Sequence, residues 1–293
     1  MFSTIIFSTT CYQMTDIGII TLLLIALTFV TSYRGFKDQS FYYKYTFEVD
    51  KILIYKDYKR LVTSGFLHIN WMHLIFNMVS LYLFSYNVEA YLGGFKFLIV
   101  YFSGLIGGNL LSLFIHRYHS DYSAVGASSG VCAVIFASIS LFPSMHIGLF
   151  FLPISFPAWA YGLGYVLFSI YAIRSRKDNV GHDAHLGGAI IGMIIALLMH
   201  PSSIVENYRP ILLIITPAAI FLYVIITRPH LLFVDNNFFN RHYRNVTIDQ
   251  KYNIAKQETQ QEIDRILDKI NTKGMASLTS KERKVLEEFA EKK

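Results

Sequence analysis

The sequence predicts an all-helical protein that crosses a membrane several times and ends in a polar tail. Of its 293 residues, 53% are hydrophobic and only 16% are charged, which is too apolar for an ordinary soluble domain. Half of the 26 Lys and Arg residues lie from Arg228 onward. The net charge of +6 therefore indicates a basic surface near a membrane rather than a nucleic-acid partner.

Seven apolar stretches are candidates for membrane spans. The seven expected spans are residues 17–31, 71–91, 95–115, 128–141, 147–173, 184–199 and 210–227. No Lys or Arg precedes the first span and no cleavage site follows it, so we expect a retained transmembrane helix rather than a signal peptide. The fourth and sixth spans are short and should be surrounded by protein. The fifth contains Pro153 and Pro157, so its first part should be irregular.

The spans and the polar segments between them define the expected domains. We expect residues 1–204 to form a six-helix membrane core, residues 205–228 an additional transmembrane helix, and residues 229–293 a polar tail. Residues 34–68, between the first two spans, are rich in aromatic side chains and suit the membrane–water interface.

The tail carries two short apolar stripes within residues 258–291, separated by Gly274, which predict a small helical hairpin. Ser280 lacks the acidic partner of a capping box, because Arg283 stands where that partner would be, so it predicts only a weak helix start. Residues 229–246 mix apolar and basic side chains and are expected to lie along the interface.

Polar side chains inside membrane spans are costly, and they indicate function by default. His73 and Asn77 are four residues apart at the start of the second span, so they share one helix face, and both can donate hydrogen bonds. His185 begins the sixth span, with Gly188 and Gly192 on its face. These glycines should let another helix approach closely.

The third polar group is Ser128-Ser129, which opens the fourth span after Gly126. Small residues at a helix entrance leave backbone N–H groups free to hold an anion. Counting the membrane crossings places all three polar groups near one membrane face, each at the N-terminus of a helix. These groups are the two serines, His185, and His73 with Asn77. Acyl transfer requires a serine nucleophile, a histidine base and donors that stabilise the oxyanion, and we expect His73 and Asn77 to be those donors. We therefore expect a Ser–His dyad, since Asp183 should point away from His185 on the helix.

At these residues the chain resembles the rhomboid family of intramembrane serine proteases. The resemblance rests on His-x-x-x-Asn in the second span, a Gly-x-Ser stretch at the fourth, and Ala-His-x-x-Gly-x-x-x-Gly at the sixth, and it covers about residues 15–200. It extends to Arg60, His68 and Glu89, which it implies are structural: the first two shape the first loop, and Glu89 is a hydrogen-bond partner for that loop. It also implies a half-submerged first loop and an active site in a water-filled cavity. The tail resembles those of Bacteroidetes-type rhomboids.

The nucleophile has two possible positions, because the family pattern is Gly-x-Ser-Gly. If Ser128 is the nucleophile, Gly126 is kept and Ser129 replaces the second glycine. If Ser129 is the nucleophile, Gly130 is kept and Ala127 replaces the first glycine.

Adjacent residues on a helix differ in direction by about 100°, so only one of the two serines can face His185. The Ser128 alternative keeps the first glycine. It also places Cys132 and Ala133, both small, one turn further on, where the sixth span must pack. We therefore favour Ser128.

The expected function is an intramembrane serine endopeptidase that cleaves transmembrane segments of membrane proteins. The alternative is an inactive rhomboid-like protein that binds membrane clients. A transporter would need inverted repeats and charged pathway residues, and the sequence has neither. We expect no metal and no cofactor, and the two cysteines, Cys11 and Cys132, suggest no disulfide framework. The expected partners are the bilayer and transmembrane substrates, in a multi-pass protein of a bacterial inner membrane.

Two arguments disagree about the side of the membrane on which the site lies. The first loop, Arg117, the Arg174–Lys177 cluster and the tail are all expected on the catalytic side, with only Lys96 and Arg209 opposite. The positive-inside rule therefore puts the site in the cytoplasm. The family resemblance implies the outer side, which we favour because the first loop is partly a membrane element. With seven spans, the tail would lie on that side too.

Overall fold

A computed structural model describes residues 18–148, 155–175 and 180–227, and residues 266, 269, 270, 275–279 and 282 of the tail. The chain divides into two compact units, Met1–Leu232 and Phe233–Lys293. In the described part, long helices occur at all seven expected spans, and the only sheets are two short two-stranded ones. Among the described residues, four helices are long and apolar enough to cross a membrane by length and composition: α1 (Ile19–Lys37), α6 (Gly94–His116), α9 (His182–Met199) and α11 (Tyr208–Thr227). The predicted class, an all-α polytopic membrane protein, is confirmed.

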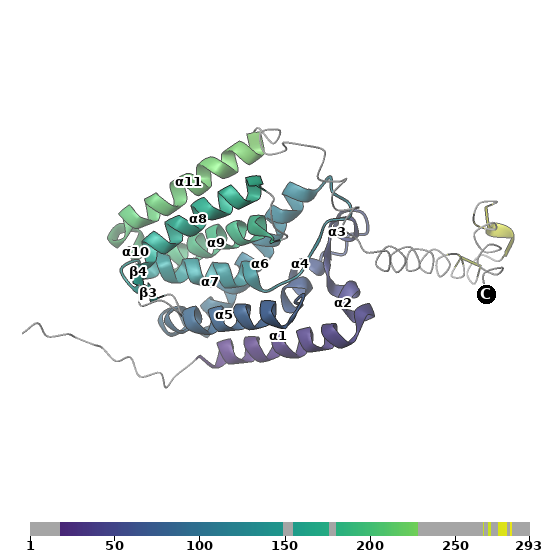
Figure 1. Cartoon of the computed structure of the whole chain (residues 1–293), viewed down its shortest axis with the longest axis horizontal. Coiled ribbons are helices and arrows are strands. Elements are labelled where there is room, and N and C mark those ends of the chain that lie inside the picture. The colour runs from purple at the N-terminus through teal and green to yellow at the C-terminus, as the bar shows by residue number, and fades with distance from the viewer. Residues whose placement is uncertain are drawn as a thin grey trace, which may run out of the picture. The chain divides into compact units, whose positions relative to one another are not determined.

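The long helices lie side by side, with α1 and α11 at opposite edges of the first unit and α7 between them (Figure 1). They are α1 (Ile19–Lys37), α5 (Trp71–Leu92), α6 (Gly94–His116), α7 (Ser128–Leu141), α8 (Ala158–Ser175), α9 (His182–Met199) and α11 (Tyr208–Thr227). The short helices of the first unit are α2 (Gln39–Tyr45), α3 (Val49–Leu53), α4 (Arg60–Thr63), η1 (Ser64–Phe66) and α10 (Ser202–Glu206). The strands are β1 (Phe47–Glu48), β2 (Ser123–Ala124), β3 (His146–Gly148) and β4 (Ser155–Pro157).

The first loop is folded around Arg60, as the sequence predicts. The Arg60 side chain is buried, and its guanidinium donates to Asp57 Oδ2 at 2.9 Å and to the carbonyl oxygens of Thr46 and Tyr43. A guanidinium has five donors in a fixed fork, so one side chain can hold several turns of backbone together. Strand β1 of this loop pairs antiparallel with β2, which precedes Ser128. The loop is therefore joined directly to the segment that enters α7.

The expected role of Glu89 was wrong in one respect, because its partner is α1 and not the first loop. Its carboxylate, near the end of α5, accepts from the N–H groups of Ile20 and Thr21 and from the Thr21 hydroxyl. The first N–H groups of a helix lack internal acceptors, and a negative charge there is favourable. Glu89 thus caps α1 at the end of the bundle opposite to the first loop.

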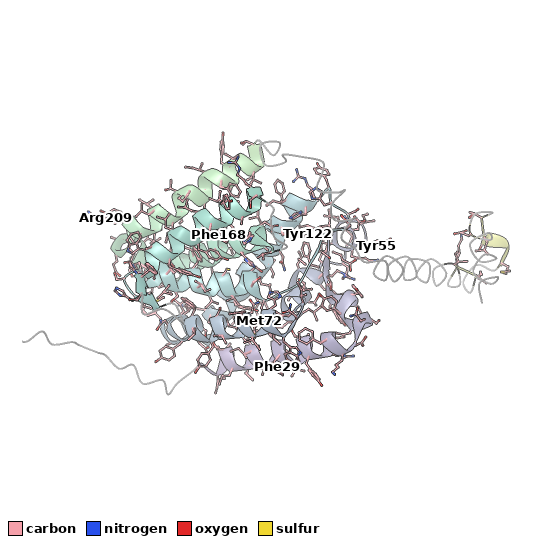
Figure 2. All side chains as sticks on the ribbon, viewed as in Figure 1. Phe29, Tyr55, Met72, Tyr122, Phe168 and Arg209 are labelled. Carbon is pink, nitrogen blue, oxygen red and sulfur yellow. The ribbon has the colours of Figure 1, made fainter. Side chains whose placement is uncertain are left out.

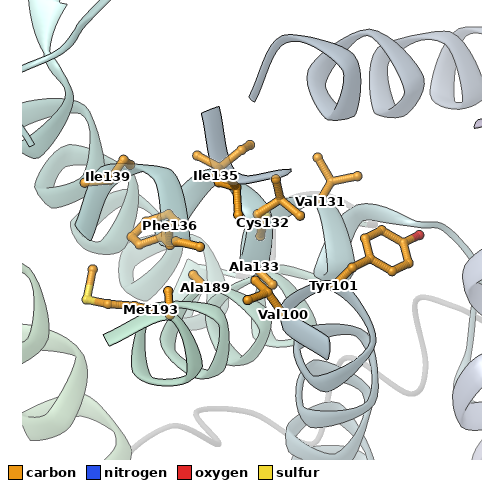
Figure 3. Close-up of a cluster of buried hydrophobic side chains, with 14 of the residues drawn as sticks. Val100, Tyr101, Val131, Cys132, Ala133, Ile135, Phe136, Ile139, Ala189 and Met193 are labelled. Carbon is orange, nitrogen blue, oxygen red and sulfur yellow. The ribbon is translucent and has the colours of Figure 1, made fainter. Parts of the chain in front are cut away.

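Helix α7 is the centre of the bundle. Every residue from Ser129 to Leu141 is buried, and α7 contacts α5, α6, α8 and α9. Its 14 residues span only about 21 Å, so it is too short to cross a bilayer of about 30 Å alone and is surrounded by protein, as expected. Figure 3 shows its apolar side chains packed against Val100 and Tyr101 of α6 and Met193 of α9.

Glycines set the spacing between α7 and its neighbours. A Cβ at Gly188 would overlap the backbone of Ser129, and a Cβ at Gly192 would overlap the backbone of Ala133. The prediction that this face of α9 admits another helix is confirmed. Lipid tails are as apolar as leucine, so helices associate in membranes through such close packing rather than through the hydrophobic effect.

Cys132 and Ala133 of α7 face different neighbouring helices. Ala133 packs against α9 and α6, where Gly104 faces its side chain. Cys132 turns instead to α8, with its Sγ atom 3.1 Å from the Tyr165 hydroxyl. The expectation that both residues meet the sixth span is therefore wrong for Cys132.

The fifth span begins irregularly, as its prolines predict. Strands β3 and β4 pair antiparallel, with Ile147 opposite Phe156, and α8 starts only at Ala158.

In the tail, described residues include η3 (Met275–Ser277) and the buried Ile266 and Leu278. A capping box that was not predicted from the sequence begins one residue before Ser280 and pairs Thr279 with Glu282. Thr279 N–H donates to the Glu282 carboxylate at 2.8 Å, and Glu282 N–H donates back to Thr279 Oγ1 at 3.3 Å. Residues 229–246, Gly274 and most of the two apolar stripes lie outside the described residues.

Two glycine substitutions test the packing of α7 against α9. Gly188→Ala should lower the unfolding temperature in detergent, because overpacking typically costs about 1–3 kcal/mol. Gly164→Ala is the matched control: a Cβ at that position in α8 would meet no atom within 4 Å beyond the adjacent backbone of its own helix, so alanine should be neutral or should stabilise by up to ~1 kcal/mol. A Gly188→Ala protein as stable as the control would contradict this account of the interface.

Candidate active site

Ser128 and His185 meet at the N-terminal ends of α7 and α9. Ser128 is the first residue of α7, and His185 lies in the first turn of α9. The distance from His185 Nε2 to Ser128 Oγ is 2.6 Å. Both residues are only partly buried, so other molecules can reach them. A histidine at hydrogen-bond distance from a serine hydroxyl is the arrangement that general-base activation requires.

The neighbouring serine has different surroundings. Ser129 is 2% exposed. Its Cβ lies 2.7 Å from the position of a Cβ built on Gly108 of α6, and its carbonyl faces Gly188 of α9. The hydroxyl that reaches His185 is thus that of Ser128, while Ser129 packs between α6 and α9.

The turn before α7 requires a glycine at position 126. Gly126 has φ 138°, a conformation that other residues rarely adopt. A Cβ at Gly126 would lie 2.8 Å from His73 Cε1 and 3.6 Å from Ser128 Oγ, so the His73 ring and the serine hydroxyl flank this glycine. Gly126 N–H donates to the Ser64 carbonyl at 3.0 Å. Gly126, the glycine kept in the Ser128 alternative, is therefore required by its backbone conformation and by the nearby His73 ring.

His68 accepts a hydrogen bond from the backbone of Ala127, the residue before Ser128. Ala127 N–H donates to His68 Nε2 at 3.4 Å, so the ring proton must be on Nδ1. Nδ1–H then donates to Ser32 Oγ, and the Ser32 hydroxyl donates to the Phe66 carbonyl, both at 2.8 Å. This chain ties the entrance of α7 to α1 and the first loop. The sequence indicated a structural role for His68 but gave no signal for Ser32, which is one of several serines in apolar helices.

The two candidate oxyanion donors lie in the first turns of α5, and the His73 ring flanks Gly126 beside the Ser128 hydroxyl. Asn77 Nδ2 donates to the His73 carbonyl at 2.9 Å, and the amide keeps a second N–H. Among the described residues, His73 Nδ1 has no hydrogen-bond partner. The N-cap residue of α7, Ala127, offers no side-chain cap, so the N–H groups of the first turn remain available to an anion.

Asp183 points away from His185, as the sequence predicts. It contacts His116 of α6 rather than His185, and the two atoms concerned are 3.2 Å apart. Within the described ranges, no group of three or more His, Cys, Asp or Glu side chains is arranged to hold a metal ion.

Fold and site together define a multi-pass helical membrane protein in which a serine and a histidine meet at the N-terminal ends of two different helices. Residues 55–202, just over half of the chain, match the Rhomboid domain family. The chain is a member of the rhomboid family. Residues 246–292 match a second family, DUF6576, whose function is unknown.

Named relatives agree with this family. The chain is 31% identical over 150 residues to the mitochondrial RHOMBOID-like protein 12 of Arabidopsis thaliana, covering 46% of this chain and 44% of that protein. It is 30% identical over 151 residues to the mitochondrial Rhomboid protein 1 of Saccharomyces cerevisiae, covering 49% and 43%. It is 29% identical over 159 residues to Rhomboid protease AarA of Providencia stuartii, covering 48% and 56%. The chain therefore spans about half the length of these relatives.

The His68 contact predicts a pH dependence of stability. Burial, and to a lesser degree the nearby His73 ring, lowers the pKa of His68 from 6.5 to about 3. Between these values the unfolded chain binds a proton at His68 and the folded chain does not. Stability should therefore fall as the pH is lowered through this window, by up to ~1.4 kcal/mol per pH unit.

Unfolding temperatures between about pH 7 and pH 4.5 would measure this effect. The control is His68→Gln, which keeps an acceptor for Ala127 N–H but does not titrate. Its unfolding temperature should depend less steeply on pH, and a slope equal to that of the wild type would refute the assignment.

Proposed function

We propose that this protein is an intramembrane serine endopeptidase, with Ser128 as the nucleophile and His185 as the general base. The observation that carries the proposal is the 2.6 Å distance between Ser128 Oγ and His185 Nε2. Similarity to Rhomboid protease AarA supports protease activity at the level of the family. The proposed substrates are transmembrane segments of membrane proteins, and no cofactor or metal takes part.

In the proposed reaction, His185 Nε2 takes the proton from Ser128 Oγ as this oxygen bonds to the carbonyl carbon of the scissile peptide. His185 then gives the proton to the leaving nitrogen, the C–N bond breaks, and an acyl-enzyme remains. A water molecule next gives its proton to His185 and attacks the ester, and the proton returns to Ser128 as the acid product leaves. A dyad suffices for this cycle because the histidine acts first as base and then as acid.

The tetrahedral intermediate carries a negative oxygen that needs donors already in position. We assign this role to the N–H groups at the start of α7, with His73 and Asn77. His73 flanks Gly126 on the Ser128 side, and Asn77 lies one turn further along α5 with one amide N–H still available. A helical peptide bond is shielded by its own hydrogen bonds, so substrates should be segments that unwind readily.

The remaining parts of the proposal concern the chain as a whole. We divide it into a rhomboid core over residues 1–204, an additional helix over 205–228 and a tail over 229–293. We place it in a bacterial inner membrane with the site on the outer side. The positive-inside rule favours the opposite orientation, and labelling of a cysteine introduced into the tail distinguishes the two.

One observation favours a second function. Ser129 stands where the family pattern has a glycine after the nucleophile, and an inactive, client-binding protein would tolerate such a change. A fluorophosphonate probe separates the two, because it labels an activated serine and spares an inactive site.

Single serine substitutions test the nucleophile. Ser128→Ala should reduce cleavage of a model transmembrane substrate by at least about a thousandfold, since it removes the attacking atom. Ser129→Ala is the matched control and should stay within a few-fold of the wild type, because Ser129 packs between helices. The reverse pattern would move the nucleophile by one residue, and activity that survives both changes would end the protease proposal.

The oxyanion assignment makes a separate prediction. His73→Ala and Asn77→Ala should each lower kcat by about 10²–10³-fold, with KM nearly unchanged, because the donors act mainly on the transition state. Steady-state cleavage kinetics would measure both constants. A rise in KM at constant kcat would instead assign these residues to substrate binding.

A further inference from the structure

A buried carboxylate that the proposed mechanism does not use lies close to the site. Asp183 is two residues before His185 in the first turn of α9, and it is 5% exposed. Two residues along a helix differ in direction by about 200°, so Asp183 faces away from Ser128. A charged group at such a position is costly unless it is paired, so its partner needs an explanation.

The partner is the last residue of α6. His116 Nε2 lies 3.2 Å from Asp183 Oδ2. An ionised carboxylate can only accept, so this approach is favourable when Nε2 carries a proton. No donor among the described residues is aligned for a hydrogen bond to that oxygen, and the contact is therefore mainly electrostatic. On its other side, His116 Nδ1 lies 3.2 Å from Nδ1 of His119.

His116 also connects to the segment that leads to Ser128. Its ring stacks on Tyr122, with centroids 3.6 Å apart and planes within 5° of parallel. The Tyr122 hydroxyl accepts from Ser112 at 3.3 Å, and its carbonyl accepts from Val49 N–H in the first loop at 3.2 Å. Figure 2 shows Tyr122 at the end of the bundle that faces the first loop, opposite to Arg209.

The Tyr122 phenol also lies near Asp183. Its oxygen and Asp183 Oδ1 are each 3.8 Å from one point, the position of a Cβ at Gly181. Burial, and secondarily the Asp183 carboxylate, raises the pKa of Tyr122, so the ring stays neutral and the stack persists. Three segments therefore converge here: the end of α6, the start of α9 and the loop before α7.

We propose that Asp183, His116 and Tyr122 form a clasp, the α6–α9 clasp, which positions His185 against Ser128. One end of the clasp is two residues from the base, and the other lies in the loop that carries the nucleophile. A displacement of about 1 Å between reacting groups can cost about 100-fold in rate, so a contact that fixes both ends matters for catalysis. This inference rests on the proposed function, and Asp183 and His116 are positioning residues in it.

Three substitutions test the clasp. Asp183→Asn keeps the shape of the side chain and removes its charge. His116→Phe keeps a ring on Tyr122 and removes the proton that faces Asp183. Both should lower kcat by about tenfold, with KM within about twofold of the wild type. His116→Gln keeps a donor near the position of Nε2 and should retain most of the activity.

The matched control is a polar contact at the other end of α9. The Tyr91 hydroxyl lies 2.9 Å from His200 Nε2, and Tyr91→Phe removes this contact without touching the site. Its kcat should be unchanged. Unchanged kcat in folded Asp183→Asn and His116→Phe proteins would overturn the proposal, and so would an equal loss in the Tyr91→Phe protein.

Hydrogen exchange provides a readout that does not depend on protease activity. Backbone amides at the start of α9, from His182 to Gly187, should exchange faster in Asp183→Asn and His116→Phe than in the wild type, and at the wild-type rate in Tyr91→Phe. If the wild type cleaves no substrate, the proposed function fails. The exchange rates then test the clasp without any activity measurement. Identical rates in the wild type and the three variants would overturn it.

Discussion

The close approach of α7 to α9 is the constraint on which the rest of the site depends. It is possible because Gly188 and Gly192 present no side chain to the backbone of Ser129 and Ala133. In a bilayer, helices associate through this kind of close packing together with interhelical hydrogen bonds and lipid entropy. The same approach brings the first turns of both helices together, and with them Ser128 and His185. The two serines at the start of α7 therefore face in different directions. Ser129 packs between α6 and α9, while Ser128 faces His185.

A second set of contacts fixes the entrance of α7. His68 holds the N–H of Ala127, Ser64 holds that of Gly126, and β1 pairs with β2 just upstream. Most of these partners belong to the first loop, which is itself folded around the buried Arg60. Hydrogen bonds thus join the first loop to the segment that carries the serine. This explains why a long polar segment between two membrane helices contains so many buried backbone contacts.

Much of this arrangement could be predicted. The apolar spans, the polar groups at the starts of α5, α7 and α9, and the glycine face of α9 follow from periodicity and from counting crossings. The errors were local ones. The family resemblance implies that Glu89 bonds to the first loop, whereas its partners are Ile20 and Thr21 of α1, which are far away in sequence. Cys132 was expected to meet α9, but a single turn of helix cannot show which of several neighbours a side chain faces.

The sequence by itself determined the class of the protein, the parts of the candidate site and their common position at helix N-termini, because these depend on composition and on helical spacing. It left the two serines as alternatives, since both are small, polar and adjacent. Only the tertiary structure decided which hydroxyl reaches His185, because that depends on the rotation of α7 about its axis. This rotation is set by Ser129 and Ala133 packing against glycines of α6 and α9, and by the positive φ of Gly126. Such contacts join residues that are far apart in the chain.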